Sequence, residues 1–428
     1  MSVRGATVRA SLALAAVLAG GACVAAAPSA QVRYLSDSHS RRASLEASLV
    51  NRDNGYSTLR LARYATGTSG DWDALPEWNP PAEPLDAAML ATPRAPVAAG
   101  AAPLGVDAAA SSGDIAALRA LGEAAFFRYP AQLLDAAEVV TSEAIAARYG
   151  LWTDAGHGVG GLVRLRTTDG VTHLAVSCAT CHAAQRGDCL SVGVGNDRLD
   201  VGALLVDARR GAGPASAAQL AWGPGRLDVT TLDGSEPVRI PDLRPVRSLG
   251  YLHHTASVEQ RDETSLAVRL ETLIITSNGQ AVRPPRAIAL GLAIYVRSLA
   301  DGLAARPPQS DAALRGQSLF MAHCSGCHAP PSFTGRPVAI DLVGTDPVVG
   351  RSRERGTGTY RVPSLLGVAG RGLLLHDASI SSVSELLDPA RTGADYRGRL
   401  GGPAPGHRFG LDLAAEDRAA IAAFVAGL

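Results

Sequence analysis

Apolar residues recur at helical spacing in four segments of the chain, which predicts four helices. The segments span residues 114–127, 286–299, 313–320 and 416–428. The apolar faces comprise Ile115, Leu118, Leu121 and Ala125 in the first segment, and Ile421, Phe424, Val425 and Leu428 in the last. We expect both faces to pack into a core, because an apolar stripe on a helix needs a covering partner.

A different pattern fills residues 160–178, "GGLVRLRTTDGVTHLAVSC", which alternate apolar and polar positions. Asp169-Gly170 interrupts the alternation, and this dipeptide between two alternating runs predicts a small β-hairpin. Residues 28–80 are polar and mixed, and residues 80–112 are rich in Pro, Ala and Gly, as in linkers. We therefore expect residues 28–112 to be poorly structured.

Length and charge narrow the range of functions. With 428 residues, of which 46% are hydrophobic, the chain is long enough for two or three domains with their own cores. Its 40 basic and 40 acidic side chains cancel, which gives no reason to expect nucleic acid or an anionic membrane as partner. Beyond the N-terminus no apolar run reaches about 18 residues, so we expect no transmembrane span.

Residues 1–27 have the pattern of an export signal. Two arginines precede an apolar run over residues 10–19, and small residues follow. Cys23 is a candidate for a lipid anchor, although Gly20 stands where a lipobox usually has Leu; cleavage by ordinary signal peptidase is the alternative. The sequence thus predicts a periplasmic or cell-envelope protein.

Two Cys-x-x-Cys-His motifs carry the most specific chemistry. They comprise Cys178, Cys181 and His182 in "CATCH", and Cys324, Cys327 and His328 in "CSGCH". In c-type cytochromes each thiol forms a thioether to haem and the adjacent His binds the iron. A zinc site would combine two Cys pairs 146 residues apart, whereas its halves normally lie closer. A redox dithiol does not need the His, and two cysteines three apart are poorly placed for a structural disulfide. The motifs therefore predict two covalently attached haem c groups. Pro330 and Pro331 leave free backbone carbonyls, one of which is a candidate to accept a hydrogen bond from Nδ1 of His328, with a plain turn as the alternative.

An internal repeat relates the two halves. Residues 240–258 and 362–380 align without gaps at an offset of 122, with eight of 19 positions identical. In each half one predicted helix precedes the Cys-x-x-Cys-His motif and another ends the unit. We therefore expect a mainly α fold with two cytochrome c-like haem domains, residues 113–305 and 306–428, the first carrying the hairpin in an insertion.

These features resemble the bacterial di-haem cytochrome c peroxidase superfamily. The resemblance rests on the two haem motifs, the repeated P-x-L…L-H segment and the closing residues 406–428. The segments "AWGPGRLDVT" (221–230) and "GHRFG" (406–410) are more similar to the branch that contains rubber oxygenases. The peroxidases usually carry a Met ligand beyond their His-Asp-Gly segment, whereas here no Met follows Met321.

Because Met is absent there, a histidine is the strong ligand available to the second iron. We favour His407 as its sixth ligand, with His376 as the alternative. His254 holds the equivalent position in the first repeat, and Glu259 lies near where the peroxidases place a distal acid that moves a proton between peroxide oxygens. The alternative for Glu259 is a solvent-facing carboxylate.

Three further features lie near the motifs in sequence. Trp222 is a candidate for packing between the haems or for a purely structural role, and Arg226 for an ion pair with a haem propionate. Cys189 is a free thiol or a partner of Cys23 in another molecule. The Gly-rich residues 192–202 predict a turn beside the first haem.

Two functions remain open. The first is electron transfer between periplasmic redox proteins. The alternative is an oxidoreductase that acts on hydrogen peroxide or dioxygen at the first haem, with the second haem as electron relay. A tethered accessory cytochrome, with residues 28–112 as tether, is a third option.

Overall fold

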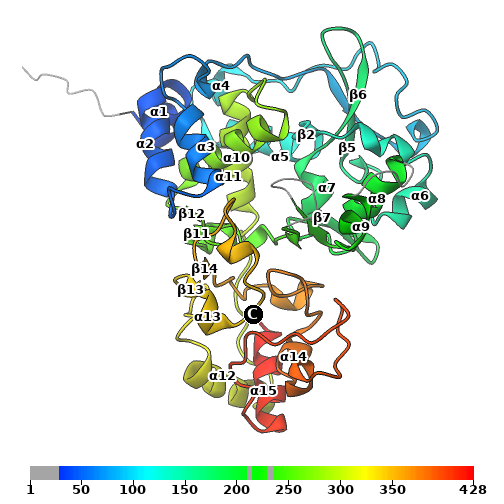
Figure 1. Cartoon of the computed structure of the whole chain (residues 1–428). Helices are drawn as coiled ribbons and strands as arrows, with labels where there is room; N and C mark the ends of the chain where they lie inside the picture. Colours follow the sequence, from blue (N-terminus) through cyan, green and yellow to red (C-terminus); the bar gives the residue numbers. More distant parts are fainter. Residues whose placement is uncertain (1–27, 210–214, 229–235) are drawn as a thin grey trace, which may run out of the picture.

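Two pairs of packed helices organise the fold (Figure 1). In the computed structural model, which describes residues 28–209, 215–228 and 236–428, α5 (Ile115–Arg128) packs on α11 (Arg286–Ser298). In the second half α12 (Asp311–His323) packs on α15 (Ala415–Val425). The four helices expected from the apolar spacing are therefore confirmed, and the chain is mainly helical.

Both pairs cross at a small residue. A methyl group added at Gly122 of α5 would overlap the carbonyl oxygen of Gly291 in α11. The same change at Gly316 of α12 would overlap the carbonyl oxygen of Ala420 in α15. The absence of a side chain at these glycines lets the two backbones touch.

One helical turn after each crossing, aromatic rings meet. Phe126 and Tyr295 have ring centroids 5.4 Å apart at 59°. Phe320 and Phe424 lie 5.3 Å apart at 58°. Each ring follows its crossing residue by four positions, so the two helix pairs are copies of one packing arrangement.

The predicted apolar faces are buried with one exception. Leu118, Leu121 and Ala125 are buried, as are all four residues of the C-terminal stripe. Ile115 is 47% exposed, so its expected place in the core is wrong. It is the first residue of α5, next to the N-cap Asp114.

The sequence repeat is also a repeat of backbone conformation. In the first copy β11 (Tyr251–Leu252) pairs with β12 (Val258–Glu259), with Leu252 opposite Val258. In the second copy Leu374 pairs with Ile380, which are the equivalent positions. Positive φ angles recur as well, at 62° and 53° for His253 and Ala256, and at 62° and 60° for Leu375 and Ala378.

The predicted hairpin is confirmed and belongs to a larger sheet. Its strands are β5 (Leu162–Arg166) and β6 (Thr172–Val176), and Gly170 in the turn has a φ of 81°. Short strands β1 (Ala82–Pro84) and β2 (Gln132–Leu133) flank them, which gives an antiparallel sheet of order β1-β5-β6-β2. The Pro-rich residues 80–112 thus supply one edge strand.

The remaining helices and strands are short and complete the two halves. They are α4 (Ala108–Ser111), α6 (Glu143–Arg148), β3 (Thr153–Asp154), β4 (Gly158–Val159), α7 (Cys178–His182), β7 (Ala183–Arg186), β8 (Cys189–Val192), α8 (Val201–Ala208), α9 (Ala215–Leu220), β9 (Arg226–Leu227), β10 (Val238–Arg239), β13 (Val338–Ala339), α13 (Ile340–Val343), β14 (Thr359–Tyr360) and α14 (Val383–Leu386).

The N-terminal segment is better ordered than its composition suggests. It forms α1 (Ala30–Ser36), α2 (Ser38–Ser48) and α3 (Gly55–Arg63), which lie beside α10 (Glu263–Ser277) and α11 (Figure 1). The expectation of poor structure is therefore wrong for these helices. Their buried positions include polar residues, such as Arg41, Ser57 and Arg60, so the apolar periodicity that marks a helix is weak.

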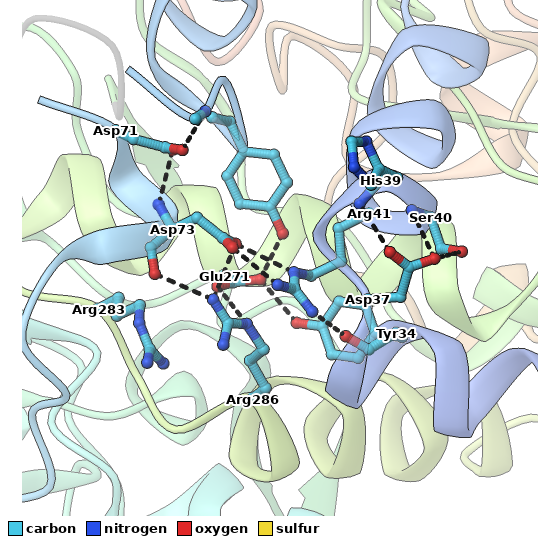
Figure 2. A network of polar contacts seen from close by, with 12 residues as sticks. Tyr34, Asp37, His39, Ser40, Arg41, Asp71, Asp73, Glu271, Arg283 and Arg286 are labelled. Atoms are coloured by element: carbon cyan, nitrogen blue, oxygen red, sulfur yellow. Dashed lines mark hydrogen bonds and ion pairs between the residues drawn. The ribbon is translucent and has the colours of Figure 1, made fainter. Parts of the chain in front are cut away.

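A buried polar network fastens this segment to the first half (Figure 2). The carboxylate of Glu271, on α10, accepts hydrogen bonds from the hydroxyls of Tyr34 at 2.8 Å and Tyr64 at 2.6 Å. Asp73 pairs with Arg41 and with Arg286, both at 2.8 Å. Because each buried charge has a partner, the network stabilises the docked position of α1–α3.

The same segment contacts the second half. The amide of Gly55 donates to the carbonyl of Arg353 at 2.9 Å, and that of Tyr56 donates to Glu354 at 2.8 Å. The N-terminal helices therefore join the two halves.

The predicted export signal and Cys23 lie in residues 1–27, outside the described residues. Within the described ranges no helix combines the length and apolar character that crossing a bilayer requires.

Candidate functional site

Each Cys-x-x-Cys-His motif lines its own cavity. Cys181 and His182 line the first, of about 160 Å³. Cys324, Cys327 and His328 line the second, of about 300 Å³. Since the motifs face different cavities, their cysteines do not converge on one zinc ion, and the described residues contain no group of three or more His, Cys, Asp or Glu suited to a metal.

The first motif forms α7 and is supported by the Gly-rich loop. The amide of Gly193 donates to the carbonyl of His182 at 2.7 Å, and that of Asn196 donates to Cys181 at 2.9 Å. Residues 192–202 therefore form the expected turn against the motif.

The second motif begins where α12 ends. Cys324 is the C-cap of α12, and the amide of His328 donates to the Cys324 carbonyl at 2.9 Å. This turn brings the thiols and the imidazole of the motif to the cavity wall.

The motif histidines are oriented by backbone carbonyls. Nδ1 of His182 lies 3.1 Å from the carbonyl oxygen of Pro241. Nδ1 of His328 lies 3.1 Å from that of Phe333, so the acceptor is a backbone carbonyl, as in the first of the two alternatives, although it belongs to a residue two positions beyond Pro331. The carbonyl of Pro363, the repeat equivalent of Pro241, is a second backbone hydrogen-bond acceptor for His328, and this bond opposes the lowering of the His328 pKa by burial. Donation from Nδ1 leaves Nε2 as the metal-binding nitrogen.

Burial keeps these imidazoles neutral. It lowers the pKa of His182 to about 4 and that of His407 to about 4, and it also lowers the pKa of His328. A neutral imidazole is the form that binds a metal. The cavity therefore favours ligation over protonation at neutral pH.

The motif cysteines are free thiols. Burial raises the pKa of Cys178 and of Cys181 to about 12, and that of Cys324 to about 11. Cys189 is also free and lies exposed on β8. Among the described cysteines none forms a disulfide, so both motifs keep the thiols that thioether formation requires.

His407 faces His328 across the second cavity. Their ring centroids are 6.5 Å apart. Two imidazoles that bind one metal from opposite sides, each at about 2 Å, have ring centres roughly 6 Å apart. Nδ1 of His407 has no hydrogen-bond partner among the described residues. The structure thus brings together the two histidines that the sequence favoured as ligands of one iron.

His376 lines the same cavity in a different role. Its ring stacks on Tyr360, with centroids 4.1 Å apart and an angle of 22°. Met321 is 46% exposed on α12 and does not turn inward.

Two histidines of the first repeat copy, His253 and His254, line the first cavity. His253, which the sequence analysis did not single out, has Nδ1 2.6 Å from the Ser257 hydroxyl, and its Nε2 accepts from Nε of Arg269. Nε2 of His254 donates to the carbonyl of Arg239 at 2.8 Å. Both Nε2 atoms are therefore engaged. The sequence feature that pointed to His253 was its position directly before His254 in the repeat.

Three predicted site residues lie away from both cavities. The Glu259 side chain is 40% exposed and pairs with Arg261 at 3.4 Å. Trp222 is buried beside α8, near Gly202. Arg226 donates to the carbonyls of Ala221 and Trp222 at 3.4 and 3.3 Å. The structure does not bring these side chains to the motifs.

The residues present fit a covalently bound haem. Each motif offers two free thiols and an imidazole with a fixed tautomer. The second cavity is lined by apolar side chains, among them Phe320, Leu365, Val368, Leu374, Ile421 and Val425. Such a wall suits a flat, largely apolar cofactor.

No protein-family model and no curated protein matches this chain. The assignment of its chemistry therefore rests on the residues described above.

Proposed function

We propose that this chain is an exported di-haem c-type cytochrome that transfers electrons between periplasmic redox proteins. Its two helix pairs are then two cytochrome c-like domains, with haem 1 held by Cys178, Cys181 and His182 and haem 2 by Cys324, Cys327 and His328. The proposal rests on the resemblance to di-haem peroxidases and on the geometry of the motifs.

One observation carries the proposal. Each motif directs at least one free thiol and a carbonyl-anchored imidazole to a cavity of its own: Cys181 and His182 line the first, and Cys324, Cys327 and His328 line the second. A redox dithiol would not need the anchored imidazole, and a zinc site would need the ligands to converge.

The second site further indicates the type of haem. A c-type haem supplies one-electron redox chemistry once bound. His328 and His407 are placed to ligate from opposite sides, and axial Met, which raises the potential of cytochromes c, has no counterpart here. We therefore expect a low-potential second site.

Covalent haem content tests the proposal. Wild-type protein secreted into a periplasm with haem-attachment machinery should carry two haems, counted by intact mass and by the pyridine haemochrome assay. Cys178→Ser with Cys181→Ser, and Cys324→Ser with Cys327→Ser, should each leave one haem, whereas Cys189→Ser should keep two. Wild-type protein without covalent haem would refute the proposal.

A second candidate is turnover of hydrogen peroxide or dioxygen at haem 1. It is favoured by the engaged Nε2 atoms of His253 and His254, because neither is free to bind an iron opposite His182. Glu259 is not placed to move protons there. Electron paramagnetic resonance of the oxidised and half-reduced protein separates the candidates. A high-spin ferric signal in either state supports the enzyme. Two low-spin signals in the oxidised protein, with only a low-spin signal from the remaining ferric haem after half-reduction, leave electron transfer alone.

A further inference from the structure

The two repeats exchange equivalent contacts across their interface. The amide of Arg239 donates to the carbonyl of His376 at 2.8 Å. The amide of Arg361 donates to the carbonyl of His254 at 2.8 Å. Arg239 and Arg361 are related by the offset of 122, as are His254 and His376. The interface is thus an internal pseudo-twofold, like the isologous contact of a dimer.

This quartet lies between the two cavities. All four residues line the second cavity, and Arg239 and His254 also line the first. The arginines are therefore positioned to act on ligands in the cavities, with Arg239 common to both.

Neither arginine has a carboxylate partner among the described residues. Arg239 is buried, and its guanidinium donates only to carbonyls, those of Leu375 at 2.9 Å and Ile240 at 3.4 Å. Nε of Arg361 is buried without a hydrogen-bond partner. Burial lowers the pKa of Arg239 to about 9 and that of Arg361 to about 10, so both stay charged at neutral pH.

The nearby carboxylate is already neutralised. Asp242 accepts from Arg244 at 2.6 Å and from Arg371 at 3.0 Å. Two arginines already bind this acid. Asp377, the other carboxylate that acts on Arg239, accepts from the Ser379 hydroxyl at 2.8 Å and forms no ion pair with Arg239, so neither Arg239 nor Arg361 has an ion pair among the described residues. Buried charges are costly unless they are paired, and guanidinium pairs best with a carboxylate.

We infer that Arg239 and Arg361 bind the propionate carboxylates of the two haems, with Arg239 shared between both sites. This inference rests on the proposed function. It transfers to Arg239 and Arg361 the role that the sequence suggested for Arg226, which lines neither cavity. The interface between the repeats is then also the electrostatic link between the two redox centres.

Reduction potentials test the inference. A cation near haem favours the reduced form, which carries one positive charge less, so removing it lowers the potential. Arg239→Gln should lower the potentials of both haems, and Arg361→Gln that of haem 2. We expect the ratio of reduced to oxidised haem at a fixed potential to fall about tenfold, equivalent to about 59 mV for a one-electron couple. Arg226→Gln is the matched control: Arg226 lines neither cavity, so the potentials of this variant should shift less than those of Arg239→Gln and Arg361→Gln.

Further outcomes keep the test decisive. If the potentials of Arg239→Gln and Arg361→Gln match those of Arg226→Gln while two haems are present, the inference is overturned and the proposed function stands. Arg239→Lys retains the charge and should restore both potentials. An equal shift in Arg239→Lys and Arg239→Gln would mean that Arg239 acts through packing, which also overturns the inference.

If Arg239→Gln does not fold, the potential of haem 2 in Arg361→Gln tests the inference in its place. Absence of haem from the wild type would instead refute the proposed function.

Discussion

At the residue scale, the position of His407 is set by its backbone. Its φ is 52°, in the left-handed region that non-glycine residues seldom adopt and that costs about 1–3 kcal/mol. The buried guanidinium of Arg391 compensates, because it donates to the carbonyls of Ala404, Gly406 and His407. A strained residue held by a buried arginine is typical of a functional position.

Replacing His407 should open the second iron. His407→Gly accommodates the positive φ, removes the imidazole, and should convert the low-spin ferric signal of haem 2 to high-spin. His376→Phe is the control, since a phenyl ring retains the stack on Tyr360, and it should stay low-spin. Persistence of the low-spin signal in His407→Gly would exclude His407 as the ligand. Electron paramagnetic resonance and the visible spectrum measure both variants.

The motifs and the favoured pair His328 and His407 were predictable from residue types and from the lack of Met. Arg239 and Arg361 were not singled out, although they are identical and directly precede the aligned repeat. Their importance depends on which carboxylates lie within reach, and that is decided by tertiary packing. The exposed position of Glu259 agrees with the solvent-facing alternative that the sequence offered, rather than with a distal acid.

At the element scale, the crossings of the two helix pairs leave no room for a side chain at Gly122 or Gly316. Gly122→Ala and Gly316→Ala each place a methyl group against a carbonyl of the facing helix, so the helices must separate. We expect each change to lower the free energy of unfolding by about 2 kcal/mol. Gly105→Ala, which meets no atom within 4 Å, is the control. Chemical denaturation measures all three, and equal stability of Gly122→Ala and the control would contradict the packing account.

The N-terminal helices show where prediction from apolar pattern fails. Buried Arg41 and Arg60 are satisfied by Asp73 and Thr272, so polar residues occupy core positions. A pattern of apolar spacing cannot reveal a face that is buried through ion pairs and hydrogen bonds. The hairpin at Asp169-Gly170, by contrast, depends on local turn geometry and was predictable.

Removing the acceptor at the centre of this network should release the segment. Glu271→Ala leaves the buried hydroxyls of Tyr34 and Tyr64 without their charged acceptor, while Arg286 keeps its ion pair with Asp73, and should cost about 3–5 kcal/mol. Tyr34→Phe removes one hydrogen bond to the carboxylate and should cost about 1.5 kcal/mol. Thermal unfolding gives both values. A smaller loss for Glu271→Ala than for Tyr34→Phe would show that the network does not hold the segment.

At the scale of the whole molecule, Asp242 links the halves through Arg371. Burial alone would raise the pKa of Asp242, but its hydrogen bonds and ion pairs with Arg244 and Arg371 outweigh burial and lower it. A lowered carboxyl pKa contributes stability above about pH 4, the unfolded value, and loses it as pH falls through the folded value. The junction between the halves should therefore weaken in acid.

The difference in unfolding free energy between wild type and Asp242→Asn, followed from pH 7 to pH 2, tests this. We expect about 3 kcal/mol at pH 7, narrowing below about pH 4 as the wild-type carboxylate becomes protonated. The exposed pair of Asp341 and Arg351 supplies the control, and Asp341→Asn should change stability by less than about 1 kcal/mol. A difference that does not vary with pH would rule out the ionised form as the source.

The crossed contacts between the repeats have a consequence for how the protein is made. As the chain is synthesised and exported, the first half emerges with the amide of Arg239 and the carbonyl of His254 still lacking their partners, which are His376 and Arg361. The amide of Arg239 and the carbonyl of His254 stay hydrogen-bonded to water until most of the second half has been synthesised. Contacts between residues so distant in sequence form late and slowly. A nascent first half is therefore an incomplete surface, suited to pairing with the second half of another copy, and expression conditions that slow translation should favour such swapped dimers.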